Sequence, residues 1–195
     1  MSLAIGFLVY SPMATYVALL RGINVGGKNL IKMPALKACF EAGGFRNVST
    51  YIQSGNVLFR TAGSDQAGLI SRIEELLEAT FKYRASVVLR SANQLQKIVT
   101  RAPDGFGAQP ARYRYDVIFL KEPLEAATAM KDVRTRPGVD QALAGSGVLY
   151  FSRLISRASQ SQLSRIVSLP IYQSMTIRNW NTTTKLLRMM EAREE

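Results

Sequence analysis

The segment Val48-Ser49-Thr50-Tyr51-Ile52-Gln53-Ser54-Gly55-Asn56-Val57-Leu58-Phe59-Arg60 contains two runs of strand-forming residues with a turn between them. Aromatic and β-branched residues favour pleated, half-buried strands. Ser, Gly and Asn at the centre are residues that tolerate tight turns. The segment therefore predicts two strands, Val48–Gln53 and Val57–Arg60, joined as a hairpin by Ser54–Asn56.

A predicted helix lies on each side of this hairpin, and a predicted strand lies beyond each helix. Before the hairpin, the apolar run Thr15–Leu20 indicates a buried strand. A helix then begins near Pro34, a permitted first-turn position, and ends at Gly43. After the hairpin, a helix capped by Asp65 runs to Lys82 and is followed by a strand at Ala85–Leu89. This β-α-β-β-α-β order is typical of a ferredoxin-like arrangement.

The second half of the chain repeats this order. Its local match to the first half is between Ser54–Phe59 and Ser146–Phe151. After a short helix at Asn93–Val99, the predicted elements are a strand at 113–120, a helix at 123–131, a hairpin over 139–151, a helix at 159–167, a strand at 175–178 and a helix at 179–190. We therefore expect an α+β protein of two tandem ferredoxin-like subdomains with antiparallel sheets and a closing C-terminal helix.

The boundaries of these subdomains follow from composition. We place the N-terminal subdomain at residues 13–100 and the C-terminal subdomain with the final helix at 113–195. The segment between them, 101–112, is rich in proline and glycine and is predicted to be a linker. Residues 1–12 are apolar, lack a basic residue and a signal-type cleavage site, and are too short to span a bilayer. We interpret them as an extension or tag.

The composition limits the catalytic groups, metal sites and disulfides that the chain can contain. The chain has no histidine, which removes the commonest general base and metal ligand, so we expect neither a metal site nor a cofactor. The single cysteine, Cys39, excludes intrachain disulfides and thiolate zinc clusters, and its helical setting predicts a buried apolar role. Lack of disulfides fits a reducing cytoplasm. The sequence shows no carboxylate pair suited to acid–base catalysis, so catalytic residues are unknown and an enzyme is neither supported nor excluded.

The predicted topology brings distant loops together. In a ferredoxin-like sheet the spatial strand order is 4-1-3-2, so the end of strand 1 lies beside the start of strand 3. The loop Arg21–Asn29 and the hairpin Gln53–Asn56 then share one edge of the sheet, and Lys82–Arg84 reaches it too. None of these segments contains an acidic residue. We expect a composite site rich in backbone N–H groups, amides and cations.

The net charge of +11 favours polyanionic or phosphorylated partners. The excess is concentrated where the motifs lie: residues 13–60 carry six Lys or Arg and one acid, and residues 151–195 carry seven and three. An ordinary solvated basic surface is the competing interpretation. The candidate ligand-binding residues are Arg21, Gly22, Asn24, Gly26, Gly27, Lys28, Asn29, Gln53, Ser54, Gly55, Asn56, Arg178 and Asn181.

The glycine-rich run Gly22–Asn29 approaches a P-loop and departs from it. Asn29 replaces the Ser or Thr whose hydroxyl ligates magnesium, and the helix begins only near Pro34 instead of directly after the loop. A backbone nest that binds an anion and a mainly structural loop both remain open.

Two further segments allow alternative interpretations. Trp180, the only tryptophan, is either a core anchor or a platform for a base, and Asn179 or Asn181 is a plausible N-cap for its helix. Arg112-Tyr113-Arg114-Tyr115 interleaves cations with aromatics as single-strand binders do, but a half-exposed strand explains the pattern equally well.

Three ordered motifs carry a family resemblance: Arg21–Asn29, Thr50–Phe59 and Arg178–Thr182. They closely resemble the signature of a bacterial family of uncharacterised proteins, domain of unknown function 1697, over Met13 to Met190. The resemblance implies an α+β fold of two related subdomains and carries no established reaction, substrate or catalytic residue. Thr183 departs from the branched apolar residue expected near that position.

Three functions remain open on the sequence. The first is a cytoplasmic protein that binds an anionic ligand, with nucleic acid favoured, although the aromatic-glycine signature of RNA-binding modules is absent. The second is an enzyme or sensor for a small phosphorylated metabolite or nucleotide. The third is an interaction or scaffold protein in which Arg178 and Asn181 hold the closing helix against the glycine-rich loop. No membrane partner is expected, and the oligomeric state is open.

Overall fold

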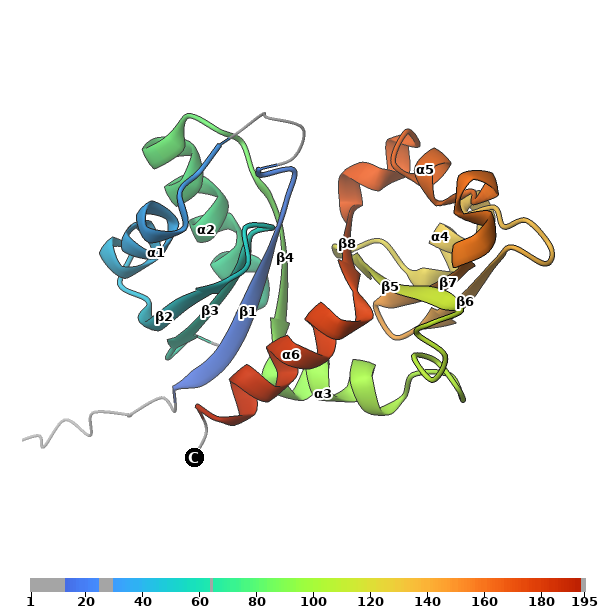
Figure 1. Cartoon of the computed structure of the whole chain (residues 1–195). Coiled ribbons are helices and arrows are strands. Elements are labelled where there is room, and N and C mark those ends of the chain that lie inside the picture. The colour runs from blue at the N-terminus through green and yellow to red at the C-terminus, as the bar shows by residue number, and fades with distance from the viewer. Residues whose placement is uncertain (1–12, 25–29, 64, 194–195) are drawn as a thin grey trace, which may run out of the picture.

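The computed structural model describes residues 13–24, 30–63 and 65–193, and the extension predicted at 1–12 lies outside them. The first half forms an antiparallel sheet in the order β2-β3-β1-β4, with two helices on one face (Figure 1). Its elements are β1 (Ala14–Arg21), α1 (Met33–Ala42), β2 (Arg46–Tyr51), β3 (Asn56–Thr61), α2 (Gln66–Phe81) and β4 (Ser86–Ser91).

The second half forms an equivalent antiparallel sheet in the order β6-β7-β5-β8. Its elements are β5 (Tyr113–Leu120), α4 (Ala126–Asp132), β6 (Asp140–Gly145), β7 (Val148–Leu154), η1 (Ile155–Gln160), α5 (Leu163–Ile166), η2 (Pro170–Ser174) and β8 (Met175–Asn179). The predicted fold of two tandem ferredoxin-like subdomains is confirmed.

The strand register shows that the two halves are equivalent residue by residue. In the first sheet Leu19 pairs with Asn56, and in the second Phe119 pairs with Val148. This register places Ser54–Phe59 and Ser146–Phe151 at the same positions in their sheets, as the sequence comparison predicted. The equivalence extends to β4 and β8, which pair with β1 and β5 in the same way.

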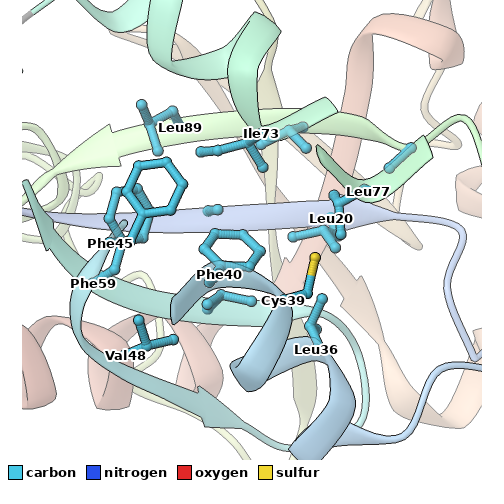
Figure 2. Packing of buried hydrophobic residues seen from close by; sticks show 14 of the residues in the cluster. Leu20, Leu36, Cys39, Phe40, Phe45, Val48, Phe59, Ile73, Leu77 and Leu89 are labelled. Carbon is cyan, nitrogen blue, oxygen red and sulfur yellow. The ribbon is translucent and has the colours of Figure 1, made fainter. Parts of the chain in front are cut away.

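Each sheet buries one face against its own pair of helices. In α2, Leu69, Ile73 and Leu77 recur at helical spacing and are buried, so that this face of the helix packs on the sheet. Phe40 and Phe59 are fully buried in the same cluster, which Figure 2 shows between the helices and the first sheet. The equivalent cluster of the second half lies under α4 and α5.

The other faces of the two sheets meet in a shared middle layer. It is filled by α3 (Ala92–Thr100) and α6 (Trp180–Glu191), which lie side by side between the halves (Figure 1). Ser91 caps α3 in a capping box with Gln94, and Asn179 caps α6. The buried members come from both sheets and both helices: Val17, Leu19, Leu58, Val88, Leu95, Ile98, Val117, Phe119, Val148, Tyr150, Leu186, Leu187 and Met190. The halves therefore share one hydrophobic core.

Residues 101–112, predicted to be a linker, form a series of turns that packs onto this layer. The Phe106 ring meets the Trp180 ring edge to face, with 5.1 Å between the ring centroids. Gly107 lies so close to Trp180 that an added Cβ would be 2.3 Å from the indole Nε1. Of the two roles predicted for Trp180, these contacts are those of a core anchor. Within the described ranges, no helix is long and apolar enough to cross a membrane.

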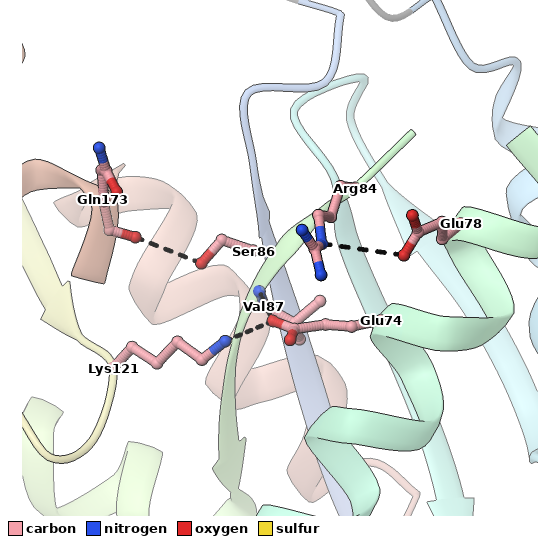
Figure 3. A network of polar contacts seen from close by, with 7 residues as sticks. All are labelled: Glu74, Glu78, Arg84, Ser86, Val87, Lys121 and Gln173. Carbon is pink, nitrogen blue, oxygen red and sulfur yellow. Dashed lines mark hydrogen bonds and ion pairs between the residues drawn. The ribbon is translucent and has the colours of Figure 1, made fainter. Parts of the chain in front are cut away.

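Polar contacts add a seam between the halves beside β4 (Figure 3). Lys121, at the end of β5, lies 2.5 Å from the Glu74 carboxylate on α2, and the same carboxylate oxygen accepts from the backbone N–H of Val87 at 2.8 Å. The Ser86 hydroxyl donates to the carbonyl of Gln173 at 3.4 Å. These contacts fix the relative position of the halves at their surface.

One predicted element is wrong. The segment 159–167 was expected to be a single helix, but it contains the end of η1 and only the single turn of α5. Only Leu163 and Ile166 are buried in α5, so a longer helix has no apolar face to bury. The Ser161 hydroxyl accepts from the N–H of Leu163, and Asp140 accepts from the N–H of Gln162, which starts the turn late.

Candidate functional site

The loops predicted to converge do meet at the end of β1. The Asn24 side chain donates from Nδ2 to the carbonyls of Ile31 and Gln53, each at 3.0 Å, and its Oδ1 accepts from the Ile31 N–H at 2.8 Å. The Tyr83 hydroxyl donates to the carbonyl of Arg21 at 2.6 Å. We call the surface formed by Arg21–Asn24, Ile52–Asn56 and Tyr83 the motif edge. Asn24 is its clamp.

The backbone of the motif edge enters the left-handed region at four residues, and at Ile52 this conformation is strained. Asn24 has φ +54° and Ile52 has φ +49°, in the left-handed region that β-branched residues rarely adopt. Gly22 and Gly55, both at φ +74°, occupy the same region at no steric cost. Ile52 is also 49% exposed, an unusual position for a large apolar side chain. Strain of this kind persists only where the surrounding contacts impose it.

Arg178 lies buried beneath the motif edge and belongs to the other half of the chain. Its guanidinium makes six hydrogen bonds. The acceptors are Asn56 Oδ1 at 2.5 Å, Leu20 O at 2.8 Å, Ser54 O at 2.8 Å, Gly55 O at 3.3 Å, Thr176 Oγ1 at 2.9 Å and Ile177 O at 2.8 Å. Burial lowers the pKa of Arg178 to about 10, so it stays charged at neutral pH. Its N–H groups therefore form hydrogen bonds within the protein.

Asn56 completes this network. Its Nδ2 donates to the Tyr51 carbonyl at 2.9 Å and to Ser54 Oγ at 3.0 Å, while its Oδ1 accepts from Arg178. The residue is fully buried, so these bonds satisfy a side chain that water does not reach. Asn56 and Arg178 are therefore supports of the edge.

Arg90 is the counterpart of Arg178 and was not among the predicted site residues. From β4 it donates to the carbonyls of Leu120 at 2.7 Å and Gly147 at 2.9 Å, which correspond to Leu20 and Gly55 in the other half. Burial likewise lowers its pKa to about 10. Each half thus supplies a buried arginine to the hairpin of the other. The available signal was the matching order of a strand arginine followed by a helix cap, Arg90-Ser91 and Arg178-Asn179.

The structure brings together most of the predicted residues that it describes. Arg21, Gly22, Asn24, Gln53, Ser54, Gly55, Asn56 and Arg178 belong to or support the motif edge. Gly26, Gly27, Lys28 and Asn29 lie outside the described residues. Asn181 is exposed on the first turn of α6, and among the hydrogen bonds of the described residues none joins its side chain to the edge.

Arg21 is the cation of the motif edge, and no carboxylate among the described residues forms an ion pair with it. Its guanidinium lies over the Tyr172 ring, 5.6 Å from the centroid. Its Nε is buried and has no hydrogen-bond partner among the described residues. The ion pairs of the described chain involve other cations. An anion beside the exposed part of the Arg21 guanidinium would balance its charge.

Cys39 has the buried position predicted for it. Burial raises the pKa of its thiol, and Sγ donates weakly to Thr80 Oγ1 at 3.4 Å. We expect Cys39 to react with Ellman's reagent at pH 7.5 on the order of 100-fold more slowly in the native protein than in urea, because the native reaction requires local opening. A native rate close to the unfolded rate would show that the thiol is accessible.

The fold and the edge together define a tandem ferredoxin-like α+β protein whose halves exchange buried arginines. The chain belongs to the family described as protein of unknown function (DUF1697), which it matches over residues 13–150, and the predicted membership is thereby confirmed. Among solved structures it is similar to the conserved bacterial protein SP0830 from Streptococcus pneumoniae. The two share 26% sequence identity with a TM-score of 0.79, over 92% of this chain and 99% of that chain. A search of curated proteins finds no match.

Proposed function

We propose that this protein binds an anionic ligand at the motif edge and that nucleic acid is the favoured class. The observation that carries the proposal is Arg21, the half-buried cation of the motif edge, which takes part in none of the ion pairs among the described residues. Its Nε lacks a hydrogen-bond partner, but so do those of Arg60 and Arg153, so the argument rests on the charge of Arg21 and on its place at the end of β1 beside the converging loops.

The rigidity of the edge supports the same proposal. Asn24, Asn56 and Arg178 hold the backbone on either side of Arg21 through hydrogen bonds, of which those of Arg178 to Asn56 and Leu20 are buried. A ligand bound there would find the groups already in place and would lose little affinity to ordering them. The left-handed backbone at Ile52 is strain that the protein maintains at its surface beside this site.

Nucleic acid is favoured over a small phosphorylated metabolite by the charge of the whole chain. A single phosphate needs one or two cations, whereas the net charge is +11. A distributed positive field attracts a polyanion from many directions and raises its rate of association. The small-metabolite alternative shares the Arg21 contact and differs in how steeply its binding depends on salt.

The proposal is tested by comparing Arg21→Gln with Arg134→Gln, an equal charge change at an exposed arginine beyond α4. We expect the wild type to bind a fluorescein-labelled, mixed-sequence single-stranded oligonucleotide with an affinity that falls steeply with salt. Arg21→Gln should lower the affinity about tenfold and reduce the slope of log affinity against log salt by about 0.7, the value for one lost phosphate contact. Arg134→Gln should stay within about twofold of wild type.

Absence of oligonucleotide binding at low salt would overturn the nucleic-acid class. Equal losses in the two variants would overturn the assignment to the motif edge, because binding would then follow net charge alone. A thermal-shift series with inorganic phosphate and sugar phosphates addresses the metabolite alternative, since a ligand that binds only the folded state raises the melting temperature.

The interaction or scaffold alternative is favoured by a specific observation of its own. Arg178 donates to the carbonyl of Leu20 in β1 and to those of Ser54 and Gly55 in the hairpin of the other half, a structural role like the one that hypothesis gives it toward the glycine-rich loop. For Asn181, the described residues show no side-chain hydrogen bond of this kind, and Gly26–Asn29 of the loop it was predicted to hold lie outside them. A scaffold would leave oligonucleotide affinity unchanged in Arg21→Gln.

A further inference from the structure

A pocket that shares no lining residue with the motif edge lies on the face of the second sheet that α4 and α5 leave open. It has a volume of about 450 Å³, within the usual range of small-molecule sites. Its floor consists of alternate residues of three neighbouring strands: Tyr113 and Tyr115 from β5, Tyr150 and Ser152 from β7, and Gln141 and Leu143 from β6. The turn Pro103–Phe106 forms its wall.

The floor and wall are mainly aromatic, and the rings support one another. Phe106 meets Tyr115 and Tyr150 edge to face, with centroid separations of 4.9 and 5.2 Å. Tyr113 lies 6.1 Å from Tyr115. The Tyr115 hydroxyl accepts from the N–H of Gln109, and the Tyr150 hydroxyl donates to the carbonyl of Ile98. The buried rings are therefore fixed, while Tyr113 and Phe106 remain half-exposed to a ligand.

The polar groups of the pocket suit a neutral ring with hydrogen-bonding edges. Gln141 offers a donor and an acceptor, Ser152 a hydroxyl and Asp104 a carboxylate. No hydrogen bond to another described residue occupies these three side chains. The lining contains no lysine or arginine and includes a second carboxylate, the buried Asp140, so the pocket itself does not select a phosphate.

A cation stands immediately outside the pocket. The Arg112 guanidinium is exposed and lies over one face of the Tyr113 ring, 5.3 Å from its centroid, so a stacked base would use the other face. A ligand whose planar part sits on the rings would place a phosphate attached to it within reach of Arg112. This division, with aromatic faces inside and a guanidinium at the rim, is the pattern by which proteins hold unpaired nucleotides.

We propose that this pocket binds a nucleobase by stacking on Tyr113 and Phe106, with Gln141, Ser152 and Asp104 facing its hydrogen-bonding edge. The base could come from a free nucleotide or from an unpaired stretch of nucleic acid, since both present the same ring. The site is separate from the motif edge and does not depend on Arg21. In the second case the chain would contact one strand at two places.

Trp180 provides a reporter for the test. It is the only tryptophan, and its ring contacts Phe106 in the pocket wall, so its indole N–H gives one signal in a ¹H–¹⁵N NMR spectrum. The full chain is titrated separately with the four nucleoside 5′-monophosphates and with short mixed-sequence single-stranded DNA. We expect a saturable shift of this signal in at least one series. Binding of mononucleotides supports the free-nucleotide source, and binding of DNA alone supports the strand.

Tyr113→Ala should weaken this binding at least about tenfold, because stacking on an aromatic ring supplies much of the affinity for a single base. Tyr113→Phe keeps the ring and should stay within about threefold of wild type. Gln141→Leu, at an exposed position, should change the order of preference among the four bases even if Tyr113→Ala folds poorly. Arg134→Gln, at an exposed arginine outside both sites, should leave mononucleotide binding unchanged, which controls for the loss of one positive charge.

The inference is overturned if no series gives a saturable shift. It is equally overturned if Tyr113→Ala and Gln141→Leu both bind every ligand as the wild type does. Loss of oligonucleotide binding in Arg21→Gln together with retained mononucleotide binding would support both sites. If Arg21→Gln binds oligonucleotides as tightly as the wild type while mononucleotides still bind at the pocket, the proposal for the motif edge fails and this inference stands.

Discussion

Arg178→Met is expected to lower the free energy of unfolding by roughly 3 kcal/mol or more, because each buried acceptor left without a donor costs about 1–3 kcal/mol. Methionine fills a similar length but offers no hydrogen bond to the carbonyls of Leu20, Ser54 and Gly55 or to the Asn56 side chain. Urea unfolding measures the loss. In a chain of this size it corresponds to roughly 6–12 °C in melting temperature.

Arg165→Met provides the matched control. Arg165 is exposed on α5, and the same substitution there should change the unfolding free energy by less than about 0.5 kcal/mol. If Arg178→Met stays within about 1 kcal/mol of wild type, water must replace the guanidinium and the network is not a structural requirement.

The pH dependence of this effect has a definite sign. Burial lowers the pKa of Arg178 from its ordinary value to about 10, so the unfolded state binds more protons than the native state only above about pH 10. Unfolding free energy rises with pH where the unfolded state holds more protons. The difference between wild type and Arg178→Met should therefore be constant from pH 6 to 8. The cost of burying the charge is relieved only as the pH passes about 10.

Gly55→Ala is expected to lower the unfolding free energy by about 2–4 kcal/mol, the sum of left-handed strain and overpacking. Gly55 has φ +74°, and a Cβ there would lie 2.8 Å from Ile23 Cδ1 and 2.9 Å from Leu20 Cβ. Both neighbours are almost completely buried and cannot withdraw without disturbing the core. Thermal or urea unfolding measures the change.

Gly138→Ala separates the two causes. Gly138 has φ +72°, nearly the same backbone conformation, but a Cβ there would meet no atom within 4 Å. It should therefore show the strain alone, about 1–2 kcal/mol. Equal losses in the two variants would contradict the packing argument and leave only the backbone conformation as the cause.

Local sequence signals predicted the strands and their pairing because those signals are short-range. Hairpin residues such as Gly55 and apolar runs such as Tyr113–Leu120 specify strands with little help from the rest of the chain. The ferredoxin-like strand order then followed from the element order alone. The segment 159–167 failed because its serine-rich sequence has only one turn of apolar residues, and tertiary contacts set where that turn begins.

The middle layer was harder to foresee because it depends on contacts between the halves. Nothing local to α3 or α6 states which helix it packs against. Arg90, in an apolar strand, gives no signal by itself, and only its alignment with Arg178 marks it as a partner. The left-handed backbone of Ile52 was equally invisible, since β-branched residues disfavour it and the surrounding edge imposes it.

Each of the two buried arginines belongs to one half of the chain and stabilises the hairpin of the other half. The hairpin of the first half is completed by a side chain from β8, and that of the second half by one from β4. In a symmetric dimer, the same residue of each subunit makes the same contact with the other subunit across the twofold axis. The chain is therefore built like a dimer whose two subunits have been joined in a single polypeptide.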